Sequence, residues 1–82
     1  MVKVIFDKQF EEVIHKIKDY SIKERLIKQI DKIIAIPDIG KPMRFSRKGT
    51  REVYVGSFRI SYIFHVEQGT LEFLDFYHKD EQ

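Results

Sequence analysis

Arg59 and the run Tyr77-His78-Lys79 carry side chains that could do chemistry together if the fold brings them to one place. A turn at Gln68-Gly69 is predicted between their two strands. If that turn is a two-residue hairpin, Arg59 lies opposite His78, and the Cβ atoms of such a pair are about 5 Å apart. If a bulge shifts the register by one residue, Arg59 lies opposite Tyr77 instead. Both registers place the arginine beside a tyrosine, a histidine and a lysine.

These side chains suit a site that binds a phosphate and a base. The guanidinium of Arg59 can neutralise a phosphate and the charge that builds on it during displacement. His78 can transfer a proton near neutral pH, and Tyr77 can stack on an unpaired base or donate its hydroxyl. Tyr54, on the preceding predicted strand, borders the same surface.

Each of these residues also has a structural interpretation. A single histidine near a strand end is more often an ordinary surface residue, Tyr77 could complete the core, and Arg59 could pair with Glu52 or Asp75. Other chemistries have less support, because the three histidines lack the spacing of metal ligands and no glycine-rich loop precedes a helix. We therefore predict no metal and no cofactor.

Positive charge is concentrated in the middle of the chain. The net charge is +2, but residues 41–65 contain six Lys/Arg against one Asp/Glu, and residues 66–82 contain one against five. Arginine is the more frequent cation in the basic segment, and its planar guanidinium matches the geometry of phosphate. A solubilising strand surface is the alternative interpretation.

Length and composition limit the architecture. With 82 residues, 43% of them hydrophobic, the chain can bury one core, and we expect a single domain over residues 1–82. There is no cysteine, which excludes disulfides and thiolate metal sites. The sequence has no signal-peptide pattern and no run of about 20 apolar residues, so we expect a cytoplasmic protein with no membrane segment.

The elements that would position these residues begin with a predicted strand over Val2–Phe6 and two amphipathic helices. Asp7 offers an N-cap for the first helix. Ser21 and Glu24 form a capping box for the second, which ends at Pro37. The apolar stripes are Phe10, Val13, Ile14 and Ile17 in the first helix and Ile22, Leu26, Ile30, Ile33 and Ile34 in the second.

From Lys41 the apolar period changes from 3.6 to 2, and the alternation of Met43 and Phe45 with Arg44 and Ser46 predicts a strand. Turns at residues 48–50, 56–57 and 68–69 separate it from three further strands. The predicted fold is α+β in the order β-α-α-β-β-β-β, with a helical hairpin packed on a mostly antiparallel, twisted sheet.

Three stretches then resemble one protein family. They are Lys-Pro-Met-Arg-Phe at 41–45, Lys-Gly-Thr-Arg-Glu-Val-Tyr-Val-Gly-Ser-Phe-Arg-Ile-Ser-Tyr at 48–62 and Leu-Asp-Phe-Tyr-His-Lys at 74–79. Their order resembles the RelE/ParE superfamily toxins of type II toxin–antitoxin systems. That family shows a Lys-Pro-Leu-like entry, a turn glycine, a Gly-x-Tyr/Phe-Arg-hydrophobic-x-Tyr strand and a closing strand followed by His-Arg or His-Lys. The resemblance extends nearly end to end.

The resemblance implies a RelE-like endoribonuclease that cleaves mRNA, usually with the ribosome, and so inhibits translation. In such enzymes the 2′-hydroxyl attacks the adjacent phosphate and an acid protonates the departing 5′-oxygen. Arg59 matches the family's arginine and should stabilise the charge on phosphorus, and Lys79 should contact phosphate. His78 is the candidate proton-transfer group. The implied RNA contacts are Arg44, Arg47, Lys48, Arg51, Tyr54 and Tyr77.

The same resemblance implies a protein partner, a RelB-like antitoxin that forms a hetero-oligomer with the toxin. It also leaves two other functions open. ParE-like members inhibit DNA gyrase without cutting RNA, and a catalytically decayed relative could act only within an antitoxin complex. Glu52 and Tyr54 stand where RelE-type enzymes often have lysines, so the identity of the catalytic acid stays open.

Overall fold

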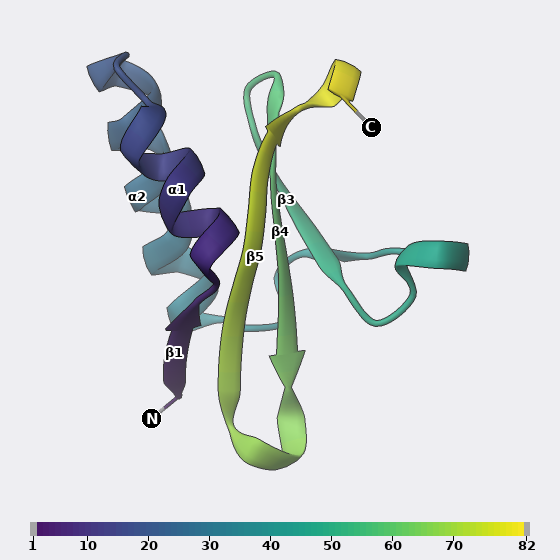
Figure 1. Ribbon diagram of the computed structural model, residues 1–82. Helices are drawn as coiled ribbons and strands as arrows, with labels where there is room; N and C mark the ends of the chain where they lie inside the picture. Colours follow the sequence, from purple (N-terminus) through teal and green to yellow (C-terminus); the bar gives the residue numbers. More distant parts are fainter. Residues whose placement is uncertain (1, 82) are drawn as a thin grey trace.

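The computed structural model describes residues 2–81, in which two helices cover one face of a five-stranded sheet (Figure 1). The elements are β1 (Lys3–Phe6), α1 (Lys8–Lys16), α2 (Tyr20–Ala35), β2 (Lys41–Pro42), β3 (Arg51–Val55), β4 (Phe58–His65) and β5 (Thr70–His78). The strand order is β1-β5-β4-β3-β2, with β1 and β5 parallel and the other three pairs antiparallel. The predicted α+β fold and element order are confirmed.

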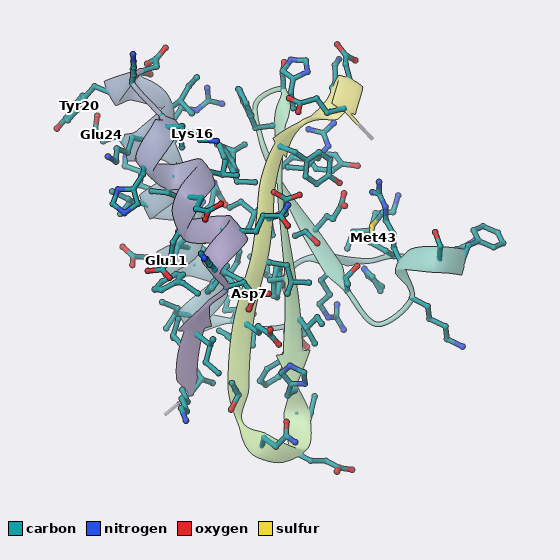
Figure 2. The ribbon with its side chains drawn as sticks, in the orientation of Figure 1. Asp7, Glu11, Lys16, Tyr20, Glu24 and Met43 are labelled. Atoms are coloured by element: carbon teal, nitrogen blue, oxygen red, sulfur yellow. The ribbon has the colours of Figure 1, made fainter. Side chains whose placement is uncertain are left out.

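The two helices present charged residues to solvent, as Glu11, Lys16 and Glu24 show (Figure 2). The predicted start of the second helix is wrong. Asp19 is the N-cap of α2, and its Oδ1 accepts hydrogen bonds from the backbone N–H groups of Ser21 and Ile22 over 2.9 and 3.3 Å. A carboxylate satisfies these free N–H groups and also complements the helix dipole, so Asp19 takes the position predicted for Ser21.

The strand predicted around residues 43–46 is also wrong. Strand β2 contains only Lys41 and Pro42, and a short 3-10 helix over Phe45–Arg47 follows it. Phe45 has a φ of 59°, in the left-handed region, which no extended strand contains. This part of the chain, drawn in teal, extends away from the sheet on the side opposite the helices (Figure 1).

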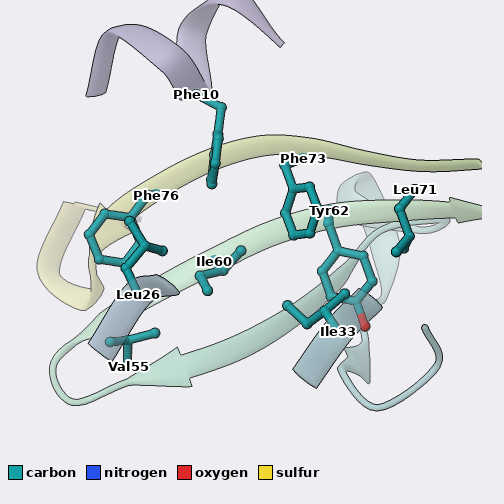
Figure 3. Close-up of a cluster of buried hydrophobic side chains, with 9 residues drawn as sticks. All are labelled: Phe10, Leu26, Ile33, Val55, Ile60, Tyr62, Leu71, Phe73 and Phe76. Carbon is teal, nitrogen blue, oxygen red and sulfur yellow. The ribbon is translucent and has the colours of Figure 1, made fainter. Parts of the chain in front are cut away.

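The core lies between the helices and the sheet (Figure 3). The predicted stripes supply its helical part, with Phe10 of α1 and Leu26 and Ile33 of α2 fully buried. Phe73 packs centrally, with ring centres 5.5 Å from Phe10 and 5.9 Å from Tyr62. The strand residues of the core are Val55, Ile60, Tyr62, Leu71, Phe73 and Phe76. Because strand residues alternate between faces, this core defines which side chains point to the other face.

The pairing of β4 with β5 follows the bulged register. The connection is a four-residue loop, because His65 pairs with Thr70 and Gly69 adopts a left-handed φ of 61°. A register shift then occurs between Ser61 and Tyr62. The two-residue hairpin is therefore wrong, and the alternative that places Arg59 opposite Tyr77 is confirmed.

Tyr62 anchors the connection that leads from α2 to β2. Its hydroxyl donates to the Pro37 carbonyl over 2.8 Å and accepts from the Gly40 N–H over 2.9 Å. Arg51 adds two bonds from Nη1, to the carbonyls of Asp38 and Gly40 at 3.1 and 2.8 Å. These contacts fix the point from which the basic segment leaves the core.

Candidate functional site

Tyr54, Arg59 and Tyr77 lie side by side on the sheet face that the helices leave open. Tyr54 of β3 pairs with Arg59 of β4, and Arg59 pairs in turn with Tyr77 of β5. Directly paired residues project to the same face, and the neighbours Val55, Ile60 and Phe76 belong to the helix-facing core. The open face therefore has an arginine with a tyrosine on each side.

Local contacts hold the guanidinium of Arg59 on the surface of the sheet. Its Cζ lies 3.7 Å from the centre of the Tyr54 ring, close enough for a cation–π interaction. Its Nη1 donates to the carbonyls of Gly56 and Phe58 over 3.2 and 3.0 Å. Arg59 is thus oriented before any ligand binds, outside the apolar interior.

A second arginine reaches the same face from the 3-10 helix. The Nη1 of Arg47 donates to Glu52 Oε2 and to the Tyr77 hydroxyl, both over 3.0 Å. The Tyr77 hydroxyl also donates to Glu52 Oε2. Glu52 is only 4% exposed, so its carboxylate depends on these two partners for charge and hydrogen bonding. The sequence allowed Arg59 to pair with Glu52 or Asp75. In the structure Glu52 pairs with Arg47 instead.

Burial raises the pKa of the Tyr77 phenol above its ordinary value of 10.0, and the hydrogen bond and negative charge of Glu52 raise it further. The positive charge of Arg47 opposes this shift only in part. Tyr77 is therefore a protonated hydrogen-bond donor at neutral pH. Its hydroxyl can supply a proton, and Arg47 lies where a tyrosinate would need a positive charge.

The structure separates His78 from Arg59. His78 pairs with Phe58, and the two rings meet edge to face with centres 5.3 Å apart, on the helix-facing side. The Nδ1 of His78 accepts a hydrogen bond from the Asp80 N–H over 3.2 Å. Lys79 is exposed just beyond β5, and its N–H donates to the Ser57 carbonyl over 2.8 Å.

The predicted RNA contacts fall into three groups. Tyr54 and Tyr77 pair with Arg59, and Arg47 bonds Tyr77 on the same face. Arg44 and Lys48 are exposed on the segment that leaves the sheet. Arg51 is different, because it pairs with Tyr62 and binds the carbonyls of the segment before β2. Its contacts are those of a structural residue.

Sequence reasoning missed Glu52 as part of the site. The only signal was a carboxylate inside a basic segment, at a strand position expected to face outward. The Glu52 side chain does face away from the core, but the side chain of Arg47 covers it.

A cleft of about 550 Å³ lies between β5 and the two helices, and Arg47 and Tyr77 of the candidate site contribute to its lining. Apolar residues line part of it, including Val13, Ile17 and Phe58, and His78 lies at its edge. Within residues 2–81 no group of three or more His, Asp or Glu side chains could hold a metal ion. No helix of that part of the chain is long and apolar enough to cross a membrane.

This fold and this arrangement of strands are those of the RelE/ParE superfamily of toxins. Residues 4–82 match the family model of the ParE toxin of the type II toxin–antitoxin system parDE. The chain belongs to this family, and it is the toxin of a toxin–antitoxin system. A comparison with curated proteins finds no match.

Solved structures share the fold at low sequence identity. The RelBE2 toxin–antitoxin complex from Mycobacterium tuberculosis is similar at 24% identity with a TM-score of 0.82, over 94% of this chain and 96% of that one. The YoeB/ParE toxin from Agrobacterium tumefaciens has 14% identity and a TM-score of 0.83, over 94% and 98%. The intact RelBE complex of E. coli has 15% identity and a TM-score of 0.80, over 95% and 96%.

Proposed function

We propose that this toxin is an endoribonuclease that cleaves mRNA at the ribosome and so inhibits translation. One observation carries the proposal: on the open face of the sheet, Arg47 donates a hydrogen bond to the Tyr77 hydroxyl and Arg59 is the residue paired with Tyr77 on the next strand. Paired cations beside a proton donor are what the displacement of a phosphate ester requires.

In the proposed reaction the phosphate binds to Arg59, whose two intramolecular hydrogen bonds use only Nη1. The 2′-oxygen of the RNA forms a bond to phosphorus while its proton passes to water. The bond from phosphorus to the 5′-oxygen breaks, and the electron pair stays on that oxygen. Arg59 stabilises the charge that develops on the phosphate, and the products are a 2′,3′-cyclic phosphate and a 5′-hydroxyl.

We assign the proton of the leaving group to Tyr77, whose hydroxyl gives up its hydrogen bond to Glu52 to deliver that proton to the 5′-oxygen. Its hydroxyl stays protonated at neutral pH, and Arg47 donates to it over 3.0 Å, so Arg47 can stabilise the tyrosinate that the transfer leaves. Lys79, exposed at the end of β5, would contact a neighbouring phosphate. His78 lies on the opposite face, so we assign it no part in the chemistry at Arg59.

Mapping of RNA ends in cells after induction tests the proposal. The wild type should create new ends within coding regions, and Arg59→Ala should abolish them without unfolding the chain. Lys23→Ala is the matched control, because it removes one exposed cation from α2 on the other side of the molecule. Unchanged cleavage by Arg59→Ala would remove Arg59 from the mechanism.

Inhibition of DNA gyrase is the second candidate, and the match to the ParE family model favours it. A gyrase-directed toxin should produce double-strand breaks and a DNA-damage response while transcripts stay intact. A chain that causes neither effect would be a decayed relative that acts only in an antitoxin complex.

We also propose an antitoxin as the partner of this chain, because several similar structures are toxin–antitoxin complexes. A RelB-like protein encoded beside the toxin should copurify with it and abolish its toxicity. Normal toxicity in the presence of that protein would contradict this partnership.

A further inference from the structure

Phe45 combines two features that are unfavourable for a phenylalanine. The residue is 90% exposed, although phenylalanine is usually buried. Its φ of 59° lies in the left-handed region, and among residues 2–81 no other residue except glycine has a positive φ. A bulky residue held in this conformation points to a function that offsets the strain.

Backbone bonds hold Phe45 in place on the basic projection, a name we give to residues 41–51. The N–H of Lys48 donates to the Phe45 carbonyl over 3.0 Å, and the N–H of Arg47 donates to the Arg44 carbonyl over 3.2 Å. Thr50 closes the turn, because its hydroxyl and its N–H both donate to the Arg47 carbonyl, over 2.8 and 3.0 Å. The exposed Phe45 therefore belongs to a turn that backbone and side-chain hydrogen bonds hold together.

The basic projection is rich in positive charge. It carries five cations and no acidic residue: Lys41, Arg44, Arg47, Lys48 and Arg51. Arg44 directly precedes Phe45, Lys48 follows it three residues later, and both are exposed. An aromatic ring between two cations matches a nucleotide, because the ring can stack on a base while the cations bind the phosphates on either side.

We propose that Phe45 stacks on an unpaired base of single-stranded RNA while Arg44 and Lys48 bind the adjacent phosphates. The inference rests on the proposed function and adds to it a base-binding subsite outside the reacting phosphate. Arg47 links the two places, because its backbone belongs to the turn of Phe45 and its side chain bonds Tyr77. The positive charge favours RNA over an apolar segment of a protein partner, and the exposed ring favours it over an acidic segment because RNA offers bases on which the ring can stack.

The experiment uses single-stranded 2′-O-methyl oligonucleotides, which cannot undergo 2′-hydroxyl attack, so binding is measured without cleavage. One oligonucleotide carries all its bases. The second has the same number of phosphates but lacks the bases at its central positions. The wild type should bind the first about tenfold more tightly than the second, the effect expected of one stacked base. Phe45→Leu, which keeps an apolar side chain but has no ring, should bind both equally.

A fluorescent variant gives a second readout. The chain has no tryptophan, so Phe45→Trp introduces a single indole at the subsite. Its emission should be quenched by the base-bearing oligonucleotide and not by the abasic one. An unchanged preference for bases in Phe45→Leu, or an indole that only an acidic polyglutamate peptide perturbs, would overturn the proposal.

The two proposals fail in different ways. If mRNA is cut normally and Phe45→Leu discriminates bases like the wild type, only the stacking subsite is wrong. If the chain binds none of these oligonucleotides and no RNA is cut in cells, both are wrong. Arg59→Ala should lose cleavage and keep the preference for the base-bearing oligonucleotide, because Phe45 and Arg59 lie on different segments.

Discussion

The hydroxyl of Tyr62 accepts a hydrogen bond from the backbone N–H of Gly40 over 2.9 Å, and this bond ties the start of β2 to the buried face of β4. The approach is so close that a Cβ built on Gly40 would lie 2.6 Å from the Tyr62 hydroxyl oxygen. A glycine is therefore required where the chain leaves the core for the open face of the sheet.

Gly40→Ala should lower the free energy of unfolding by about 1–3 kcal/mol, because the added methyl group has to displace a fully buried ring. Urea denaturation measures the change. Ser46→Ala, an exposed substitution on the same segment, is the control and should leave the midpoint within about 0.5 kcal/mol of the wild type. Equal stability of Gly40→Ala and the wild type would show that the connection can move.

Arg47→Met should destabilise the fold by about 1–3 kcal/mol, because it leaves the Glu52 carboxylate buried with the Tyr77 hydroxyl as its remaining side-chain partner. Adding Glu52→Gln removes the uncompensated charge and should restore part of the loss. A double-mutant cycle in urea measures the coupling. If the two substitutions are additive, Arg47 does not stabilise Glu52.

Alkaline pH should weaken the fold through Tyr62 and Tyr77. Burial raises the pKa of both phenols above the ordinary value of 10.0. Between the unfolded and the folded pKa, the folded state binds more protons than the unfolded state. The stability that the two protonated phenols contribute is therefore complete below the unfolded pKa and is lost as the pH rises through the folded pKa. Urea midpoints measured from roughly pH 9 to 11 should fall for the wild type and fall less for Tyr77→Phe.

Phe45→Gly should raise the free energy of unfolding by about 0.5–1 kcal/mol, because glycine adopts a positive φ without the clash that Phe45 accepts. The exposed ring contributes little burial, so its loss has little effect. Phe45→Leu keeps the strained backbone and is the control, with stability near that of the wild type. A destabilised Phe45→Gly variant would mean that the ring contacts the fold.

Tyr54→Leu should slow RNA cleavage about tenfold, because the guanidinium of Arg59 loses the aromatic face that orients it. Tyr54→Phe keeps that face and should cleave almost as fast as the wild type. Single-turnover rates on a fixed substrate separate the two variants. Similar losses in both would assign the effect to the hydroxyl of Tyr54.

Periodicity was sufficient to predict the helices and their buried stripes. Phe10 of α1 and Leu26 and Ile33 of α2 belong to the predicted apolar stripes, and burial of an apolar stripe decides which way a helix faces. The sequence also allowed both registers of Arg59. The bulge at Ser61 and Tyr62 depends on how two strands fit against one core, which neither strand sequence reveals alone.

The turn at Phe45 and the burial of Glu52 could not be read from the sequence for related reasons. Residues 43–46 alternate as a strand does, but local hydrogen bonds close a 3-10 turn there. Glu52 occupies an outward position of β3 and is buried only because Arg47, five residues earlier, folds over it. Such burial depends on where a loop goes, and periodicity carries no information about that.

The parallel pairing of β1 with β5 joins the first strand of the fold to the last. Lys3–Phe6 finds its partners at Thr70–Phe73, so β1 has no neighbour until nearly the whole chain is available. Leu71, Phe73 and Phe76 enter the core at the same step. A nascent chain that stops before β5 therefore lacks three of the nine buried core residues and also the tyrosine that pairs with Arg59, so the same strand completes the core and the candidate site during synthesis.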